Sequence, residues 1–122
     1  MPVRIRLKQR LQGSVTPSAL ATETDIINLA DQDDDYIIEG YVSLQNMASG
    51  DSVELKVYIA VDGVNQILAD RVTFTDAQDK PVVRIVAHTL PYNAKFRVTV
   101  TQNAGTLRAF PYAFMLQIME QI

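Results

Sequence analysis

The chain has 122 residues, of which 48% are hydrophobic and 20% charged, so we expect one globular domain with its own core and exclude a disordered chain. It contains no cysteine, which excludes disulfides, zinc knuckles, iron–sulfur clusters and thiol nucleophiles. The net charge of −3 conceals a separation, because residues 1–12 carry four cations and no acid, whereas residues 23–39 carry seven acids and no cation.

The first element is a strand at residues 3–11, where apolar and cationic residues alternate. This period of two is typical of a half-buried strand with an apolar face (Val3, Ile5, Leu7) and a charged one. The charged face would carry Arg4, Arg6, Lys8 and Arg10.

Small and polar residues with Gly and Pro follow this strand. We therefore predict three parts: a basic N-terminal strand or arm at 1–12, a linker at 13–22, and a β-sandwich domain at 23–122. Helix is expected at most over residues 17–23 or 114–121.

Seven further strand candidates follow, separated by turn residues. They are residues 24–29, 36–45, 53–61, 64–75, 82–90, 95–102 and 106–118. Asp62-Gly63 predicts a tight hairpin turn with positive φ at both residues, and Ala69 and Asp70 suggest a bulge in the return strand. Pro111 denies the last strand one ladder donor, which suggests an edge, a bulge or a bend.

These elements predict an all-β fold, a single antiparallel β-sandwich of about eight strands, either jelly-roll or immunoglobulin-like. The cysteine–tryptophan–cysteine core of antibody domains is absent, so the jelly roll is favoured. The predicted core is Ile38, Val42, Leu44, Val53, Leu55, Val57, Ile59, Val72, Phe74, Val83, Ile85, Phe96, Val98, Val100 and Phe114.

The sequence holds little catalytic chemistry. Asp31, Asp33 and Asp35 occupy positions 1, 3 and 5 of a calcium loop, but Tyr36 and Val42 replace the required Gly and Glu. An irregular calcium site, a solvated loop or a docking patch remain as interpretations. The only histidine, His88, should share a strand face with Arg84 and Val86, as a surface or interface residue. No nucleophile or phosphate motif occurs, so we expect neither an enzyme nor a cofactor.

Other ligands were weighed on charge and aromatic content. Four cations with no interleaved aromatic would bind a polyanion weakly, and the rest of the chain would repel it, so we expect no nucleic-acid binding. No apolar run reaches the length of a membrane span, and no signal peptide is recognisable, so no membrane is expected either. Five tyrosines leave an extracellular or carbohydrate-binding sandwich as an alternative, and a cytoplasmic adaptor module as a third.

Two segments carry a resemblance to a known class of proteins: DYIIEGYVSLQNMASGDSVELKVYIAVDG (residues 35–63) and TLPYNAKFRVTVTQNAGTLRAFPYAFML (residues 89–116). They are similar to small β-sandwich structural proteins of tailed phages and related viruses, which decorate capsids or join virion parts. The resemblance implies a virion location, a non-enzymatic capsid decoration or cement role, a homo-oligomer such as a trimer, exchanged terminal arms, and a major capsid or other virion protein as partner.

The last apolar run suggests where such contacts lie. LRAFPYAFMLQIMEQI is more apolar than one half-buried strand requires, so we expect an exposed patch on a monomer. The expected partner-binding residues are the four cations together with Phe110, Tyr112, Phe114 and Met115.

Overall fold

The computed structural model describes residues 2–121, which form eight β-strands and no helix. The strands are β1 (Val3–Val15), β2 (Thr24–Asn28), β3 (Tyr36–Ser43), β4 (Ser52–Ala60), β5 (Ile67–Thr75), β6 (Val82–Leu90), β7 (Lys95–Ala104) and β8 (Phe110–Gln121). The expected all-β sandwich is confirmed, and residues 114–121 are strand rather than helix. Within the described residues, no helix has the length and hydrophobicity needed to cross a membrane.

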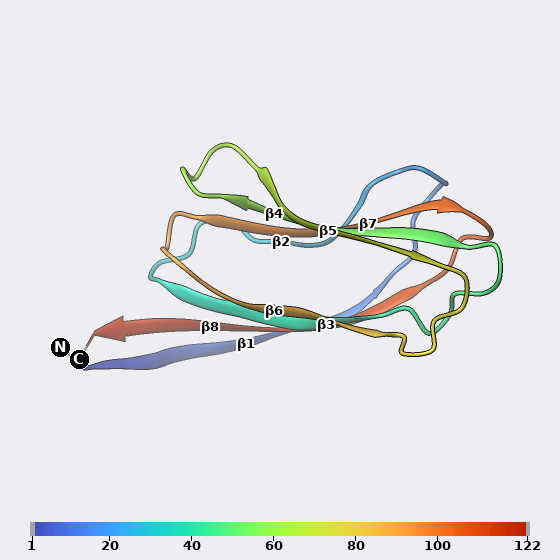
Figure 1. Cartoon of the computed structure of the whole chain (residues 1–122). Coiled ribbons are helices and arrows are strands. Elements are labelled where there is room, and N and C mark those ends of the chain that lie inside the picture. Colours follow the sequence, from blue (N-terminus) through green and yellow to red (C-terminus); the bar gives the residue numbers. More distant parts are fainter. Residues whose placement is uncertain (1, 122) are drawn as a thin grey trace.

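The strands form two antiparallel sheets of four, stacked face to face (Figure 1). Sheet A has the order β1-β8-β3-β6, and sheet B has the order β2-β7-β4-β5. Only β4 and β5 are consecutive neighbours within one sheet, so the chain crosses between sheets at nearly every turn. This interleaving is that of a jelly roll, whereas an immunoglobulin-like sandwich keeps more consecutive strands together.

The first strand belongs to the chain's own sheet A. It pairs with β8 along its whole length, from Val3 opposite Gln121 to Val15 opposite Phe110. Residues 13–15, expected at the start of a linker, continue this strand. The following loop is tied to the sandwich, because Pro17 is buried and the N–H of Ala21 donates to the carbonyl of Gln102 at 2.7 Å.

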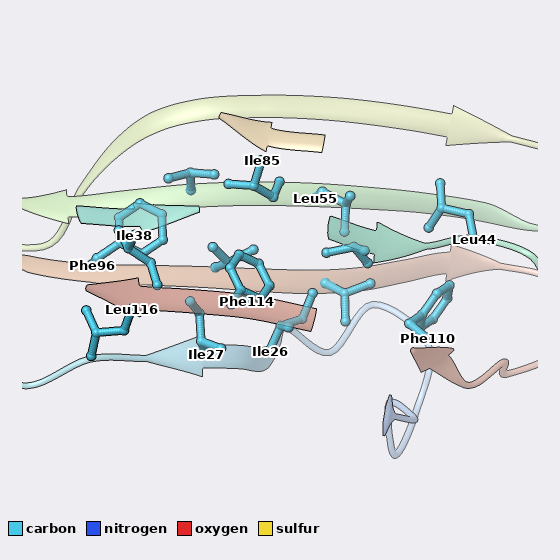
Figure 2. Packing of buried hydrophobic residues seen from close by; sticks show 14 of the residues in the cluster. Ile26, Ile27, Ile38, Leu44, Leu55, Ile85, Phe96, Phe110, Phe114 and Leu116 are labelled. Atoms are coloured by element: carbon cyan, nitrogen blue, oxygen red, sulfur yellow. The ribbon is translucent and has the colours of Figure 1, made fainter. Parts of the chain in front are cut away.

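The core fills the space between the sheets (Figure 2). Most of the predicted core is buried, and Ile59, Phe74 and Val83 pack partly against it. Val72 is a wrong prediction: its side chain points inward but is 42% exposed, because β5 is an edge strand. Among the described residues, the sequence patterns missed nine buried hydrophobic ones: Ile26, Ile27, Tyr36, Met47, Ala60, Ala94, Phe110, Leu116 and Ile118.

Three local predictions had different outcomes. The prediction of a tight Asp62-Gly63 turn is wrong. The loop between β4 and β5 spans residues 61–66, and of the two residues only Gly63 has positive φ. The carboxylate of Asp62 accepts hydrogen bonds from the N–H groups of Val64 and Asn65. The bulge at Ala69 is confirmed by the register shift opposite Val57 and Tyr58.

Pro111 lies in β8, which is a central strand rather than an edge. The proline is tolerated there because it is only the second residue of the strand, and the ladder with β3 begins one residue later, at Tyr112.

Candidate functional site

Nothing else among residues 2–121 covers the outer face of sheet A (Figure 1). Residues opposite one another in antiparallel strands share a face, so the register assigns side chains to it. One row across the sheet holds Gln12, Ala113, Tyr41 and Arg84. The neighbouring row holds Arg10, Met115 and Glu39, and Lys8 lies beside Gln117 in the next. We call these residues the sheet A face.

A hollow of about 430 Å³ lies at the centre of the sheet A face. Its cause is the short side chain of Ala113 between the longer ones of Gln12 and Tyr41, with Arg10, Glu39 and Met115 around it. A second hollow of about 540 Å³ shares the first three of these residues and continues toward the other end of the sheet. Tyr41 is 50% exposed, so its ring is available to a partner.

The four N-terminal cations do not share one face, because the register shifts between Ile5 and Leu7 and breaks the alternation. Arg4 pairs with Glu120 at 2.6 Å, and Arg6 pairs with Asp33 at 2.5 Å. Lys8 and Arg10 lie on the sheet A face and form no ion pair with the residues that the structure describes. The expectation of a single cationic face is therefore corrected to two cations on the sheet A face and two at the β1–β8 end.

The proposed partner residues of β8 also divide between two environments. Phe110 and Phe114 are buried in the chain's own core, which corrects the expected exposed patch (Figure 2). Tyr112 is half-buried over Gly13. Met115 lies on the sheet A face, half-buried at the hollow. Strand alternation is the reason, since every second residue of β8 faces the sandwich interior.

The aspartates between β2 and β3 do not assemble a metal site. Asp33 is paired with Arg6, and a carboxylate oxygen of Asp35 accepts the N–H of Tyr92 at 3.0 Å. Among residues 2–121, no group of three His, Asp or Glu side chains is arranged to hold a metal ion. The calcium alternative for Asp31, Asp33 and Asp35 finds no support in this arrangement.

His88 lies on the opposite face from the one expected. A register shift between Ile38 and Gly40 places His88 opposite Ile38, on the inner side of sheet A, whereas Arg84 lies opposite Tyr41 on the outer side. The imidazole is half-buried 5.3 Å from the ring of Phe96, and its Nδ1 lies 2.8 Å from the carbonyl of Val86. His88 is thus a packing residue at the edge of the core.

The outer face of sheet B is different, because most of its cations are paired within the chain. Arg97 pairs with Asp25 at 2.6 Å, and its guanidinium lies 5.2 Å from the centre of the Tyr58 ring. The carboxylate of Glu23 accepts hydrogen bonds from the hydroxyls of Tyr58 and Thr99, at 2.6 and 2.8 Å. Because the charged groups of this cluster already have partners within the chain, they have little to gain from binding another protein.

The same hydrogen bonds and ion pairs shift the pKa values of the charged groups on sheet B. Burial alone would raise the pKa of Glu23, but hydrogen bonds from Tyr58 and Thr99, with the charges of Lys56 and Arg97, lower it. A hydrogen bond to Glu54 raises the pKa of Lys56, and the bond to Glu23 raises the pKa of Tyr58.

Sequence patterns alone missed Gln12, Glu39, Tyr41, Arg84 and Ala113 as members of one surface. The alternation at 36–45 does place Glu39 and Tyr41 on one side of a strand. It does not reveal that β8 inserts between β1 and β3, which places Arg10 and Glu39 on either side of Met115 in one row.

No protein-family model and no curated protein matches this sequence. A structure of Bacillus endospore appendages, described as disulfide-linked pili, matches with a TM-score of 0.59 and 13% identity, covering 94% of this chain and 88% of the other. A structure of infectious bursal disease virus Gx strain matches with a TM-score of 0.50 and 11% identity, covering 98% of this chain but 32% of the other. A carbohydrate-binding module of Cellvibrio mixtus lichenase 5A reaches 0.34, which carries no argument. At such identities the likeness shows a shared β-sandwich fold alone.

Proposed function

We propose that this protein is a non-enzymatic structural subunit of a virion. In this proposal it is a capsid decoration, cement or minor capsid protein, produced in the host cytoplasm, that stabilises an assembly through protein–protein contacts. The sheet A face makes those contacts.

The observation that carries the proposal is the contrast between the two outer faces. On sheet B, Lys56, Arg71 and Arg97 are paired within the chain, and Lys95 is the one cation without an ion pair to a described residue. On sheet A, Lys8, Arg10 and Arg84 form no ion pair with any described residue, and Arg10 lines a hollow together with the exposed Tyr41. Aromatic and arginine side chains are enriched in interfaces, and unpaired charges on one face favour a partner of opposite charge.

Two further findings support the proposal. The fold is shared with structures of a pilus and of a virus, although at an identity that speaks only for the fold. The segments 35–63 and 89–116 resemble virion structural proteins in sequence.

Co-sedimentation tests the virion role. Genes adjacent to this one should encode a major capsid protein or a terminase, and particles assembled from that capsid protein should bind the purified chain saturably. Arg10→Glu should weaken this binding more than tenfold, a loss of about 1.4 kcal/mol or more, whereas Lys95→Glu, which changes the same charge on sheet B, should not. Capsids that bind neither the wild type nor the control would refute the virion role.

A second candidate function, carbohydrate binding, has one observation in its favour. The hollow places the exposed Tyr41 ring beside the amides of Gln12 and Gln117, an arrangement that can stack on a sugar ring and hydrogen-bond its hydroxyls. A glycan array with micromolar hits that Tyr41→Ala abolishes would favour this function over the structural one.

A further inference from the structure

We infer that the sheet A face binds the acidic end of a second copy of this chain. The acidic end consists of Asp31, Asp34 and Tyr92. The inference rests on the proposed function, because it names the partner that the same face takes.

The cations of the chain are distributed in a way that singles out one face. Of eleven Lys and Arg residues, six form ion pairs within the described part of the chain: Arg4, Arg6, Lys56, Arg71, Arg97 and Arg108. Of the other five, Lys8, Arg10 and Arg84 lie on the sheet A face. The only acid placed among them is Glu39, so this face is positive although the protein carries a net charge of −3.

The acidic end is the densest source of the opposite charge. Residues 31–35 contain four aspartates, and among residues 2–121 neither Asp31 nor Asp34 pairs with a cation. Tyr92 lies at the same end of the sandwich and is 54% exposed. It adds an exposed aromatic ring beside the aspartate loop.

Hydrogen bonds preorganise this end. The N–H of Gln32 donates to the carbonyl of Tyr92 at 2.9 Å, and the N–H of Tyr92 donates to a carboxylate oxygen of Asp35 at 3.0 Å. The pair between Arg6 and Asp33 attaches the loop to β1. Because the loop is already ordered, little conformational entropy is lost on docking. The attraction between opposite charges then contributes more fully to the binding free energy.

The two surfaces complement each other in chemistry and in shape. The acidic end presents carboxylates and an aromatic ring. The sheet A face presents Lys8, Arg10 and Arg84, together with a hollow of about 430 Å³ lined by Arg10, Ala113 and Met115 among others. They lie on different sides of the molecule, since the loops before β3 and β7 are at one end of the sandwich and the sheet A face runs along its side (Figure 1). A contact between two different surfaces is heterologous, so repeated docking builds a ring or a helical filament rather than a closed pair.

Charge reversal tests the inference. The face variant is Arg10→Glu with Arg84→Glu, and the end variant is Asp31→Lys with Asp34→Lys. Sedimentation velocity at tens of micromolar and low salt should show concentration-dependent association of the wild type, which salt weakens. Each variant alone should associate more than about tenfold more weakly, because like charges then meet. An equal mixture should recover association, because each reversed surface finds its opposite on the other variant.

The matched control is Arg71→Glu with Lys80→Glu, which changes the net charge by the same amount as the face variant. Both positions lie outside the sheet A face and the acidic end, so this variant should associate like the wild type. Circular dichroism should show that all variants remain folded. A wild type that stays monomeric, or a mixture that does not recover association, overturns the inference. Association lost in the face variant but kept in the end variant also overturns it, while leaving the sheet A face as the contact surface. Binding of the wild type to capsid particles is measured separately. If it persists while self-association fails, this inference is overturned and the virion role stands.

Discussion

At the scale of single residues, Asp51 is a buried carboxylate whose hydrogen bonds hold two loops together. It is 2% exposed and accepts hydrogen bonds from Ala48 N at 2.9 Å, Thr106 N at 3.2 Å and Arg108 Nε at 2.8 Å. These bonds join the loop before β4 to the loop before β8. Gly105 is required beside it, because its φ is 90° and a Cβ there would lie 1.9 Å from Asp51 Oδ1.

The environment of Asp51 predicts a loss of stability in acid. The N–H of Ala48, followed by the Arg108 guanidinium, lowers the pKa of Asp51 below its ordinary 3.8. A carboxyl whose pKa is lower in the folded state stabilises the fold fully above its unfolded pKa, and this contribution disappears as the pH falls through the folded pKa. Asp51→Asn should reduce the free energy of unfolding at pH 7 by about 1–3 kcal/mol, since donors lose a charged acceptor.

Urea titrations at pH 7 and at pH 3 measure this effect. The difference in stability between Asp51→Asn and the wild type should shrink at pH 3. Asp79→Asn is the control, because Asp79 is exposed and forms no side-chain hydrogen bond or ion pair with the described residues. Equal losses in both variants, or a loss for Asp51→Asn that does not change with pH, would contradict the role given to Asp51.

At the scale of elements, β1 has two parts with different roles. Residues 3–10 are exposed although they pair with β8, whereas Leu11 and Val15 pack against the core. The exposed part contributes the pairs of Arg4 and Arg6 and covers the edge of β8, and surface ion pairs of this kind are worth about 0–1 kcal/mol each.

Truncation separates these two roles. Removal of residues 2–8 should leave a folded domain that is less stable by about 1–3 kcal/mol, and it should weaken assembly because Lys8 is lost from the sheet A face. Removal of residues 2–15 should prevent folding, because it also takes Leu11 and Val15 from the core. Circular dichroism and thermal melting measure both. If the shorter truncation already unfolds the chain at room temperature, the exposed part of β1 is essential to the core and its role as an assembly arm is refuted.

At the scale of the whole molecule, the topology joins the two ends of the chain. The first strand pairs with the last, and β3 pairs with β8, so most of sheet A forms only when distant segments meet. Such long-range pairing delays folding, because loop-closure entropy is lost before the contacts form.

Refolding should therefore take milliseconds to seconds, on the order of other all-β sandwiches. Stopped-flow dilution from urea, followed by tyrosine fluorescence because the chain has no tryptophan, measures the rate. Complete refolding in microseconds would contradict the dominance of long-range pairing. Permutants that join β1 to β8 directly should fold faster, since their closure loop is shorter.

The sequence by itself determined the fold class and most of the core. Period-two alternation in segments such as 53–61 sets which side chains face inward, because successive residues of a strand point to opposite sides. Cysteine content and the missing motifs likewise limited the available chemistry. The charge separation between residues 1–12 and 23–39 was also visible without a structure.

Only the tertiary structure decided which side chains share a face. Two register shifts, after Ile5 and opposite Ile38, moved Arg4 and Arg6 away from Lys8 and turned His88 inward. A bulge of one residue reverses every side chain beyond it, and alternation in one strand cannot reveal it. The sheet A face also depends on β8 lying between β1 and β3, a neighbour relation set by long-range packing. The same packing buries Phe110 and leaves Val72 exposed, since burial depends on a strand's place in the sheet as well as on its sequence.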